Sequence, residues 1–290
     1  MTYTKIQWGI IFFVFCVEAI LLRFSSLSIL YSKKEIIFIL IFFSFLGLVY
    51  TFYHKFRPDM RIISLVQSTS ILLAYCPLML GFSYLGATAN QPFVDSFLAS
   101  IDSFFAIYTP SIVFWFKNNE RWQTVFSFIY NTYGFQFPFI IIYFSYRREI
   151  IPLQRFLMQF MIATPMTILL SIFYPAAGPY VWYGYTPSIE LANALKHLLQ
   201  LRHYFVDIST IDGIITIPSF HSVMALIFIY TFRHQRRIIF IPMLILNILM
   251  IFSCLPIGEH YFADILAAIP VFLLTLGIES FIFKAVKNPK

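Results

Sequence analysis

Two short runs, Pro218-Ser219-Phe220-His221-Ser222 and Gly258-Glu259-His260-Tyr261-Phe262-Ala263-Asp264, each stand at the start of an apolar stretch. They place two imidazoles and a carboxylate at the mouths of apolar helices. Ionisable groups are costly to bury in such surroundings, and by default they indicate function. The two runs are therefore candidates for one functional site if the rest of the chain brings them together.

The composition points to a membrane protein. The chain has 290 residues, of which 60% are hydrophobic and only 11% are charged, too few charges to coat a soluble domain of this size. We predict an all-α, polytopic membrane protein with about eight transmembrane helices, since a span needs about 20 apolar residues. The predicted spans are Trp8–Phe24, Ile36–Tyr53, Ile62–Leu85, Trp122–Tyr146, Leu153–Tyr174, Pro218–Phe232, Ile238–Leu255 and His260–Phe283.

Charge and cysteine content exclude two other classes. The net charge is +7, but the basic residues form small groups between apolar runs, which is typical of topology signals. We therefore expect membrane lipids as partners and no nucleic acid. Cys16, Cys76 and Cys254 lie in or beside apolar segments and are odd in number, so we expect no disulfide framework.

Positive charges also predict an orientation, because cytoplasmic loops are enriched in Lys and Arg. Three basic groups share one predicted side: Arg147, Arg148 and Arg155; Arg233, Arg236 and Arg237; and Lys284, Lys287 and Lys290. Lys33 and Lys34 violate the pattern. We predict that both termini are cytoplasmic, in the inner or plasma membrane if the source is bacterial. The loops before His221 and His260 then lie outside.

Three regions follow from this pattern: N-terminal membrane helices over 1–86, of which the third joins the core, an interfacial segment over 87–121, and a catalytic membrane core over 122–290. In the interfacial segment, Asp95 and Asp102 are seven residues apart among phenylalanines. This spacing predicts an amphipathic helix at the outer interface, broken at Pro110. We interpret it as a cover without a role in chemistry.

The longest predicted outer connection is 175–217. Ser188 is placed to cap a helix that runs to about Arg202. Lys196, Arg202 and His203 on this segment are candidates for contact with an anionic lipid headgroup, although most such residues are ordinary solvated ones.

The run Pro218–Ser222 predicts the start of a helix. Ser219 is a plausible N-cap and His221 falls in the first turn. The free N–H groups of a helix N-terminus form a ready anion site, so Ser219 and Ser222 are candidates for binding a phosphate beside His221.

The second run places His260 and Asp264 four residues apart, which puts them on one face of a helix. Asp264 would then bind one ring nitrogen and leave the other as a nucleophile or base. Two such histidines suit phosphoryl transfer: one attacks phosphorus and the other protonates the leaving oxygen. The same residues also suit a metal site or a proton relay, and those alternatives stay open.

Together the two runs resemble the second and third motifs of the type 2 phosphatidic acid phosphatase superfamily, closest to its inositol phosphorylceramide synthase and sphingomyelin synthase branch. The run Tyr174–Tyr180 also resembles bacterial members of that branch. The resemblance implies a six-helix core with two added N-terminal helices and no metal or other cofactor. It further implies that His260 is the nucleophile, Asp264 its orienting carboxylate and His221 the general acid.

This chain departs from the superfamily's phosphatases in its basic residues. Tyr174–Tyr180 has no counterpart of their Lys and Arg, and Cys254 stands where their third motif has Arg. A dianionic monoester needs such cations most. We therefore favour transfer of a phosphorylated headgroup from a lipid, with Arg202, Lys196 or the Ser219 region neutralising the phosphate.

The predicted function is a membrane-embedded lipid phosphotransferase or lipid phosphate phosphatase that works through a phosphohistidine at the extracytoplasmic face. The alternative from another class is a transporter or flippase that uses the same residues as a proton relay. The lipid itself is open: ceramide, diacylglycerol, polyprenyl and lipid A phosphates all fit.

Overall fold

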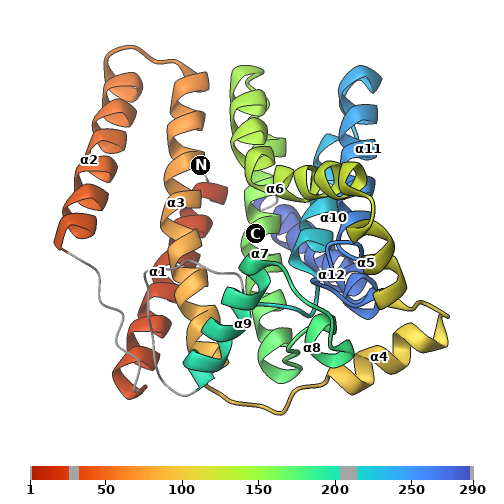
Figure 1. Cartoon of the computed structure of the whole chain (residues 1–290). Helices are drawn as coiled ribbons and strands as arrows, with labels where there is room; N and C mark the ends of the chain where they lie inside the picture. The colour runs from red at the N-terminus through yellow and green to blue at the C-terminus, as the bar shows by residue number, and fades with distance from the viewer. Residues whose placement is uncertain (1, 26–32, 203–213, 288–290) are drawn as a thin grey trace.

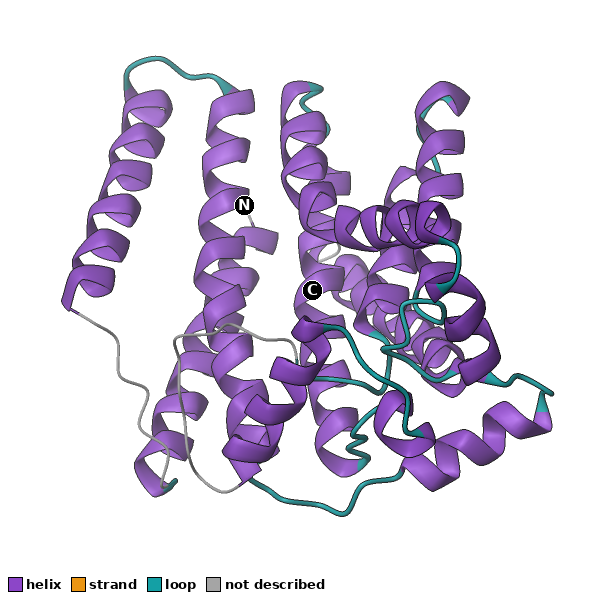
Figure 2. Ribbon diagram, in the orientation of Figure 1, coloured by secondary structure: helices purple, strands orange, loops and turns teal. Residues whose placement is uncertain are grey.

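A computed structural model describes residues 2–25, 33–202 and 214–287. Within these ranges all regular secondary structure is helical, in twelve helices joined by loops (Figure 2). The predicted all-α class is confirmed. In a membrane, helices satisfy every backbone hydrogen bond internally, which is why an apolar chain of this kind folds into them.

The long apolar helices account for the predicted spans. Six are long and apolar enough to cross a membrane, or up to seven if one bent pair counts as a span. The six are α1 (Thr2–Phe24), α2 (Lys33–Lys55), α3 (Met60–Ala87), α6 (Glu120–Tyr146), α7 (Ile150–Phe173) and α12 (Phe262–Lys287). The other two predicted spans are the shorter apolar helices α10 (Phe220–Phe232, 13 residues) and α11 (Arg237–Ser253, 17 residues). Each predicted span is therefore a helix, and the protein is a polytopic membrane protein.

The core lies between α3, α6, α7, α10, α11 and α12. Tyr75, Phe156 and Phe228 are fully buried in it, and the Tyr75 hydroxyl donates to the Met161 carbonyl at 2.7 Å. By contrast, α2 packs at the edge of the molecule (Figure 1). Only 6% of its apolar stretch of 18 residues is buried. Its exposed face suits lipid.

A buried ion pair ties the ends of the chain together. Arg155 on α7 forms two hydrogen bonds with Glu279 on α12, at 2.7 and 2.8 Å. Tyr3 on α1 also donates to Glu279 at 2.9 Å. The Glu279 carboxylate is fully buried, so the three hydrogen bonds from Arg155 and Tyr3 together satisfy a charge that would otherwise be costly.

Short helices gather at one end of the molecule. They are α4 (Asp95–Phe104), α8 (Pro179–Tyr183) and α9 (Ile189–Arg202), at the lower end of Figure 1. The bent pair is α4 and α5 (Thr109–Lys117), which meet at 87°. Pro110 lies in the first turn of α5, close to the predicted break. The predicted cap of α9 is confirmed, because Ser188 Oγ accepts from the Leu191 N–H at 3.2 Å.

Candidate active site

The start of α10 is built by two buried hydroxyls. Ser219 is the N-cap, as predicted, and accepts from the Ser222 N–H at 3.4 Å. Ser222 Oγ donates to Ser219 Oγ at 3.1 Å, and Cys254 Sγ lies 3.5 and 3.6 Å from the two oxygens. All three side chains are buried. The thiol that replaces the expected Arg therefore packs under the cap, and both hydroxyls hold the helix start together.

His260 and Asp264 form the predicted pair, but from a different backbone setting. α12 begins at Phe262, so His260 precedes the helix and does not share a helical face with Asp264. The carboxylate instead reaches back into the loop. It lies 3.3 Å from His260 Nδ1 and accepts from the Tyr261 N–H at 2.9 Å. Both side chains are almost completely buried, so the ring is held in one orientation with Nδ1 occupied.

The two motifs meet through one backbone hydrogen bond. The Ser219 N–H donates to the Asp264 carbonyl at 3.1 Å. His221 and His260 then line a single cavity of about 410 Å³ between α3, α6, α7 and α10. The structure thus brings together the three residues for which the resemblance implies catalytic roles.

The environment of His260 favours its charged form. Burial by itself lowers the pKa of the imidazole, but three influences outweigh it: the hydrogen bond to Asp264, the negative charges of Asp264 and Glu259, and a hydrogen bond with the backbone of Thr216. The pKa of His260 therefore stands above its ordinary value. The surroundings of the ring therefore stabilise a positively charged imidazolium.

Tyr130 and Glu259 adjoin the two histidines, and neither residue was among the predicted site residues. The Tyr130 ring stacks on His221 with centroids 3.8 Å apart. Its hydroxyl donates to the Glu259 carboxylate. Glu259 carried a signal, since it directly precedes His260 in the motif. Tyr130 carried none, because it is one of many aromatic residues in an apolar helix.

The helix α4, interpreted from the sequence as a cover without a role in chemistry, supplies a cap to the start of α12. Asp102 accepts from the N–H groups of Phe262 and Ala263 at 3.0 and 2.9 Å. These are the first two residues of α12, so a side chain from another helix caps it. Asp102 is fully buried, whereas Phe97 and Phe104 on the same helix are 60% and 83% exposed. The polar face of α4 therefore points inward.

The second carboxylate of α4 holds the turn that precedes α8. Asp95 accepts from the N–H groups of Ala177 and Gly178, both at 2.9 Å, and from the Tyr261 hydroxyl at 2.8 Å. Gly178 has φ +109° and a Cβ there would lie 2.7 Å from the Tyr180 ring, so only glycine fits. Asp95 and Asp102 together bind this turn to the start of α12, and we call the two residues the α4 clamp.

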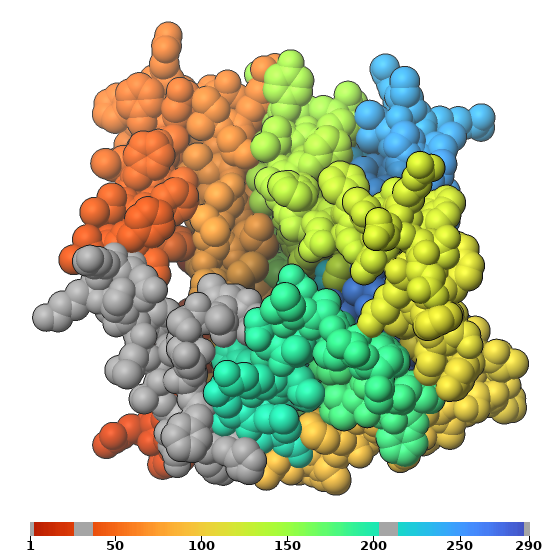
Figure 3. Space-filling view, in the orientation of Figure 1, coloured from red at the N-terminus to blue at the C-terminus, as the bar shows by residue number. Residues whose placement is uncertain are grey.

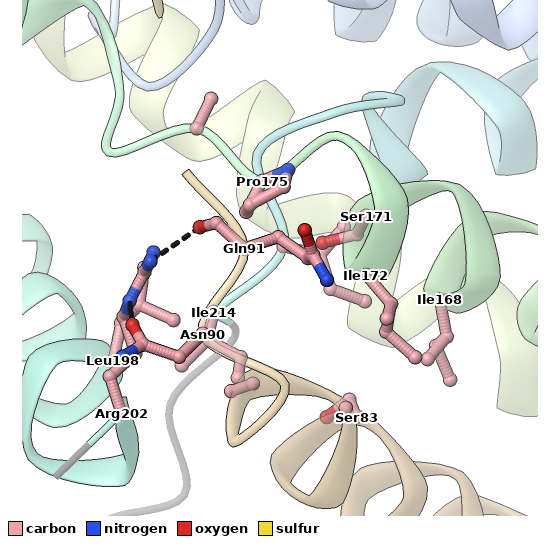
Figure 4. A pocket seen from close by; sticks show the side chains of 14 residues that line it. Ser83, Asn90, Gln91, Ile168, Ser171, Ile172, Pro175, Leu198, Arg202 and Ile214 are labelled. Atoms are coloured by element: carbon pink, nitrogen blue, oxygen red, sulfur yellow. Dashed lines mark hydrogen bonds between the residues drawn. The ribbon is translucent and has the colours of Figure 1, made fainter. Parts of the chain in front are cut away.

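Neither of the proposed phosphate-binding cations, Arg202 and Lys196, lines the histidine cavity. Arg202 donates to Asn90 Oδ1 at 2.7 Å and to the Gln91 carbonyl (Figure 4), and its guanidinium stacks over Phe93. It borders a small hollow that adjoins the cavity of the histidines, with Ser83, Ile168, Ile214 and Ile215 lining both. Lys196 is exposed on α9, and His203 lies outside the described residues.

The described lining of the histidine cavity has no Lys or Arg. It is mainly apolar, with His221, Glu259 and His260 at its polar end. Cys76, Met79 and Leu80 line it from α3, and Phe160 and Ile168 from α7. Among the described residues, those of this cavity included, no group of three or more His, Cys, Asp or Glu side chains is arranged to hold a metal ion.

A comparison with protein families bears directly on these motifs. The model of the PAP2 superfamily matches residues 96–278, more than half of the chain. This chain belongs to the PAP2 superfamily. The match includes α4 except for its first residue, Asp95, and both histidine motifs with Asp264. A search of curated proteins and a search of solved structures found no match.

PAP2 superfamily membership indicates lipid phosphatase or phosphotransferase activity in general. The match begins at residue 96, so α1, α2 and α3 lie outside it. The apolar wall that α3 adds to the cavity is therefore a feature of this chain beyond the matched PAP2 region.

Proposed function

We propose that this PAP2 superfamily member is a membrane-embedded lipid phosphotransferase, similar to inositol phosphorylceramide synthases in moving a phosphorylated headgroup, or a lipid phosphate phosphatase when water is the acceptor. The observation that carries the proposal is the pair of histidines on one cavity, with Nδ1 of His260 held by Asp264 at 3.3 Å. Both reactions begin with the same first step.

In that step the lone pair on His260 Nε2 attacks phosphorus, and a P–N bond forms as the P–O bond to the leaving group breaks. His221 gives its proton to the leaving oxygen. In the second step an acceptor hydroxyl or water attacks phosphorus, the P–N bond breaks and the acceptor's proton passes to His221. Asp264 holds the Nδ1–H and stabilises the positive ring in between.

Charge around the cavity favours a diester over a monoester substrate. The described lining carries one carboxylate, Glu259, next to the nucleophile and no Lys or Arg. A phosphomonoester brings close to two negative charges at neutral pH and a diester only one. Repulsion from Glu259 thus disfavours the monoester more, which supports headgroup transfer from a phospholipid.

The apolar lining supports a lipid as the bound substrate. A cavity of about 410 Å³ lies within the range of small-molecule sites. Acyl or prenyl chains would lie against α3 and α7, with the phosphate at the histidine end. By the charge pattern of the loops, we place this site at the extracytoplasmic face and both termini in the cytoplasm.

The test is to trap the intermediate. Full-length protein in nanodiscs would be incubated briefly with ³²P-labelled phospholipid and quenched in alkali, which preserves phosphohistidine. We expect label on wild type and none on His260→Ala. A proton-relay transporter predicts no label on either, and unimpaired lipid turnover by folded His260→Ala would refute the mechanism.

A further inference from the structure

The proposed reaction places negative charge in a cavity whose described lining has no Lys or Arg. In phosphoryl transfer that charge gathers on the non-bridging oxygens of the phosphoryl group, and positioned hydrogen-bond donors stabilise it as cations do. His221 gives its proton to the leaving oxygen, and Nδ1 of His260 is occupied by Asp264. Neither imidazole is therefore left to donate to the non-bridging oxygens.

Four side chains in the described lining carry a hydroxyl group: Ser83, Tyr130, Tyr133 and Thr164. Ser83 and Thr164 donate to backbone carbonyls of their own helices, at 2.7 and 2.8 Å. Tyr130 donates to the Glu259 carboxylate. The Tyr133 hydroxyl has no hydrogen-bond partner among the described residues, which leaves it as the hydroxyl donor that a ligand can use.

The Tyr133 ring is packed beside His221. It follows Tyr130 by three residues on α6, so the two rings share a helical face. Its centroid lies 4.9 Å from that of the His221 ring and 5.3 Å from that of the Phe137 ring. The side chain is partly exposed and lines the cavity. The phenol therefore belongs to the wall of the histidine cavity and is held in place by aromatic neighbours.

The two tyrosines differ in the space that they face. Tyr130 also lines a second cavity of about 530 Å³, between α5, α6 and the segments 185–190 and 256–259. Figure 3 shows the surface hollowed between the yellow-green α5–α6 region and the green-to-teal segment leading to α9, with blue atoms of the C-terminal part at its floor. In the described linings, Tyr133 borders the histidine cavity and not the second one. A ligand of the two histidines therefore meets Tyr133 directly.

We propose that Tyr133 is a catalytic residue, whose hydroxyl donates a hydrogen bond to a non-bridging oxygen of the phosphoryl group in transit. The inference rests on the proposed function and adds a residue to it. The phenol keeps its proton: the P–O bond to the leaving group breaks, the P–N bond to His260 forms, and the proton on the leaving oxygen comes from His221. Because the hydrogen bond strengthens as charge gathers on the accepting oxygen, it stabilises the transition state more than the bound lipid.

The first arm of the test removes the hydroxyl alone. Full-length protein in nanodiscs would be given phosphatidic acid, phosphatidylglycerol, phosphatidylethanolamine and phosphatidylinositol, and kcat and KM would be measured for each lipid that wild type turns over. Tyr133→Phe keeps the ring against His221. We expect kcat to fall about tenfold to hundredfold, with KM and Tm unchanged. Tyr146→Phe is the matched control, on the same helix but 69% exposed and outside the cavity lining, and should match wild type.

The second arm tests the contact with the non-bridging oxygen. Sulfur is a weaker hydrogen-bond acceptor than oxygen, so an analogue with sulfur in place of one non-bridging oxygen loses most of this contact. We expect the analogue, or for a diester one of its two diastereomers, to react about tenfold more slowly than the oxygen lipid on wild type. In Tyr133→Phe the hydrogen bond is already absent, so this ratio should shrink severalfold. A merely structural role for Tyr133 would leave the ratio unchanged.

The outcomes keep this inference apart from the proposed function. Slow ³²P labelling of His260 in Tyr133→Phe, together with the smaller sulfur effect, supports the catalytic role. A wild-type kcat in folded Tyr133→Phe, a rise in KM alone or an unchanged sulfur effect overturns that role and leaves the phosphohistidine mechanism standing. Absence of turnover of all four lipids by folded wild-type protein overturns the proposed function, and this inference with it.

Discussion

Glu259 sets the electrostatics at the residue scale. It lies next to the proposed nucleophile in the chain. The negative charges of Asp264 and Glu259 both raise the pKa of His260. A negative side chain at this position disfavours a dianionic substrate and favours the positive imidazole ring of a phosphohistidine. The missing Arg and the present Glu therefore act in the same direction, because both lower the positive charge around phosphorus.

The pH dependence of activity tests the effect of Glu259 on the pKa of His260. His260 must be neutral to attack, and its raised pKa means that it loses its proton at higher pH than an ordinary histidine. We expect kcat/KM to rise with pH along an acid limb centred above about 6.5. Glu259→Gln removes a negative charge, lowers the pKa and should shift the limb to lower pH. Glu120→Gln, on the exposed start of α6, should leave the limb where it is, and an equal shift in both variants would contradict the assignment.

At the scale of elements, the α4 clamp caps two backbone segments for which the sequence suggested no capping residue. Asp102 supplies two acceptor oxygens to the first N–H groups of α12, and Asp95 does the same for the turn before α8. A helix start buried without such partners would be unstable. Because α12 begins two residues after His260, the position of the imidazole ring depends on this cap.

Removing the cap should therefore misplace the nucleophile. Asp102→Ala leaves two buried N–H groups without acceptors, at a cost of about 1–3 kcal/mol each. We expect a lower thermal midpoint and a fall in kcat of tenfold or more, with partial recovery in Asp102→Asn, whose amide keeps one acceptor. Ser100→Ala, exposed on the same helix, is the control. A wild-type kcat in folded Asp102→Ala would show that the cap does not position His260.

At the scale of the whole molecule, the histidine cavity is assembled from parts that lie far apart in the chain. α3 comes from outside the family match yet provides Cys76, Met79 and Leu80 as one wall. The opposite end carries the histidines of α10 and of the loop before α12. The N-terminal part of the chain thus shapes the apolar part of this cavity.

Filling that space should select among lipid chain lengths. Leu80→Trp adds bulk to the apolar wall, so we expect turnover of long-chain substrates to fall about tenfold relative to short-chain ones. Leu48→Trp, at a position on α2 that is 71% exposed, should not change the ratio. An unchanged ratio in Leu80→Trp would mean that the chains do not occupy this cavity.

Features that depend on neighbours in the chain could be predicted from the sequence alone. The helices followed from apolar runs, the caps at Ser188 and Ser219 from local hydrogen-bonding chemistry, and the His260–Asp264 contact from a spacing of four residues. The His260–Asp264 contact is present, but the two residues do not share a helical face as predicted, because the helix begins two residues after His260. The proximity of the two histidine motifs could also be predicted, because both stand at helix starts on the same predicted side of the membrane.

Only the tertiary structure decided which distant polar groups meet. The α4 clamp joins residues of which Asp102 and Ala263 are 161 positions apart, and Tyr130 and Glu259 are separated by 129. No local periodicity encodes such contacts. They arise because burying a helix start, a phenol or a carboxylate requires a hydrogen-bond partner, and the packing of the helices determines which partner is within reach.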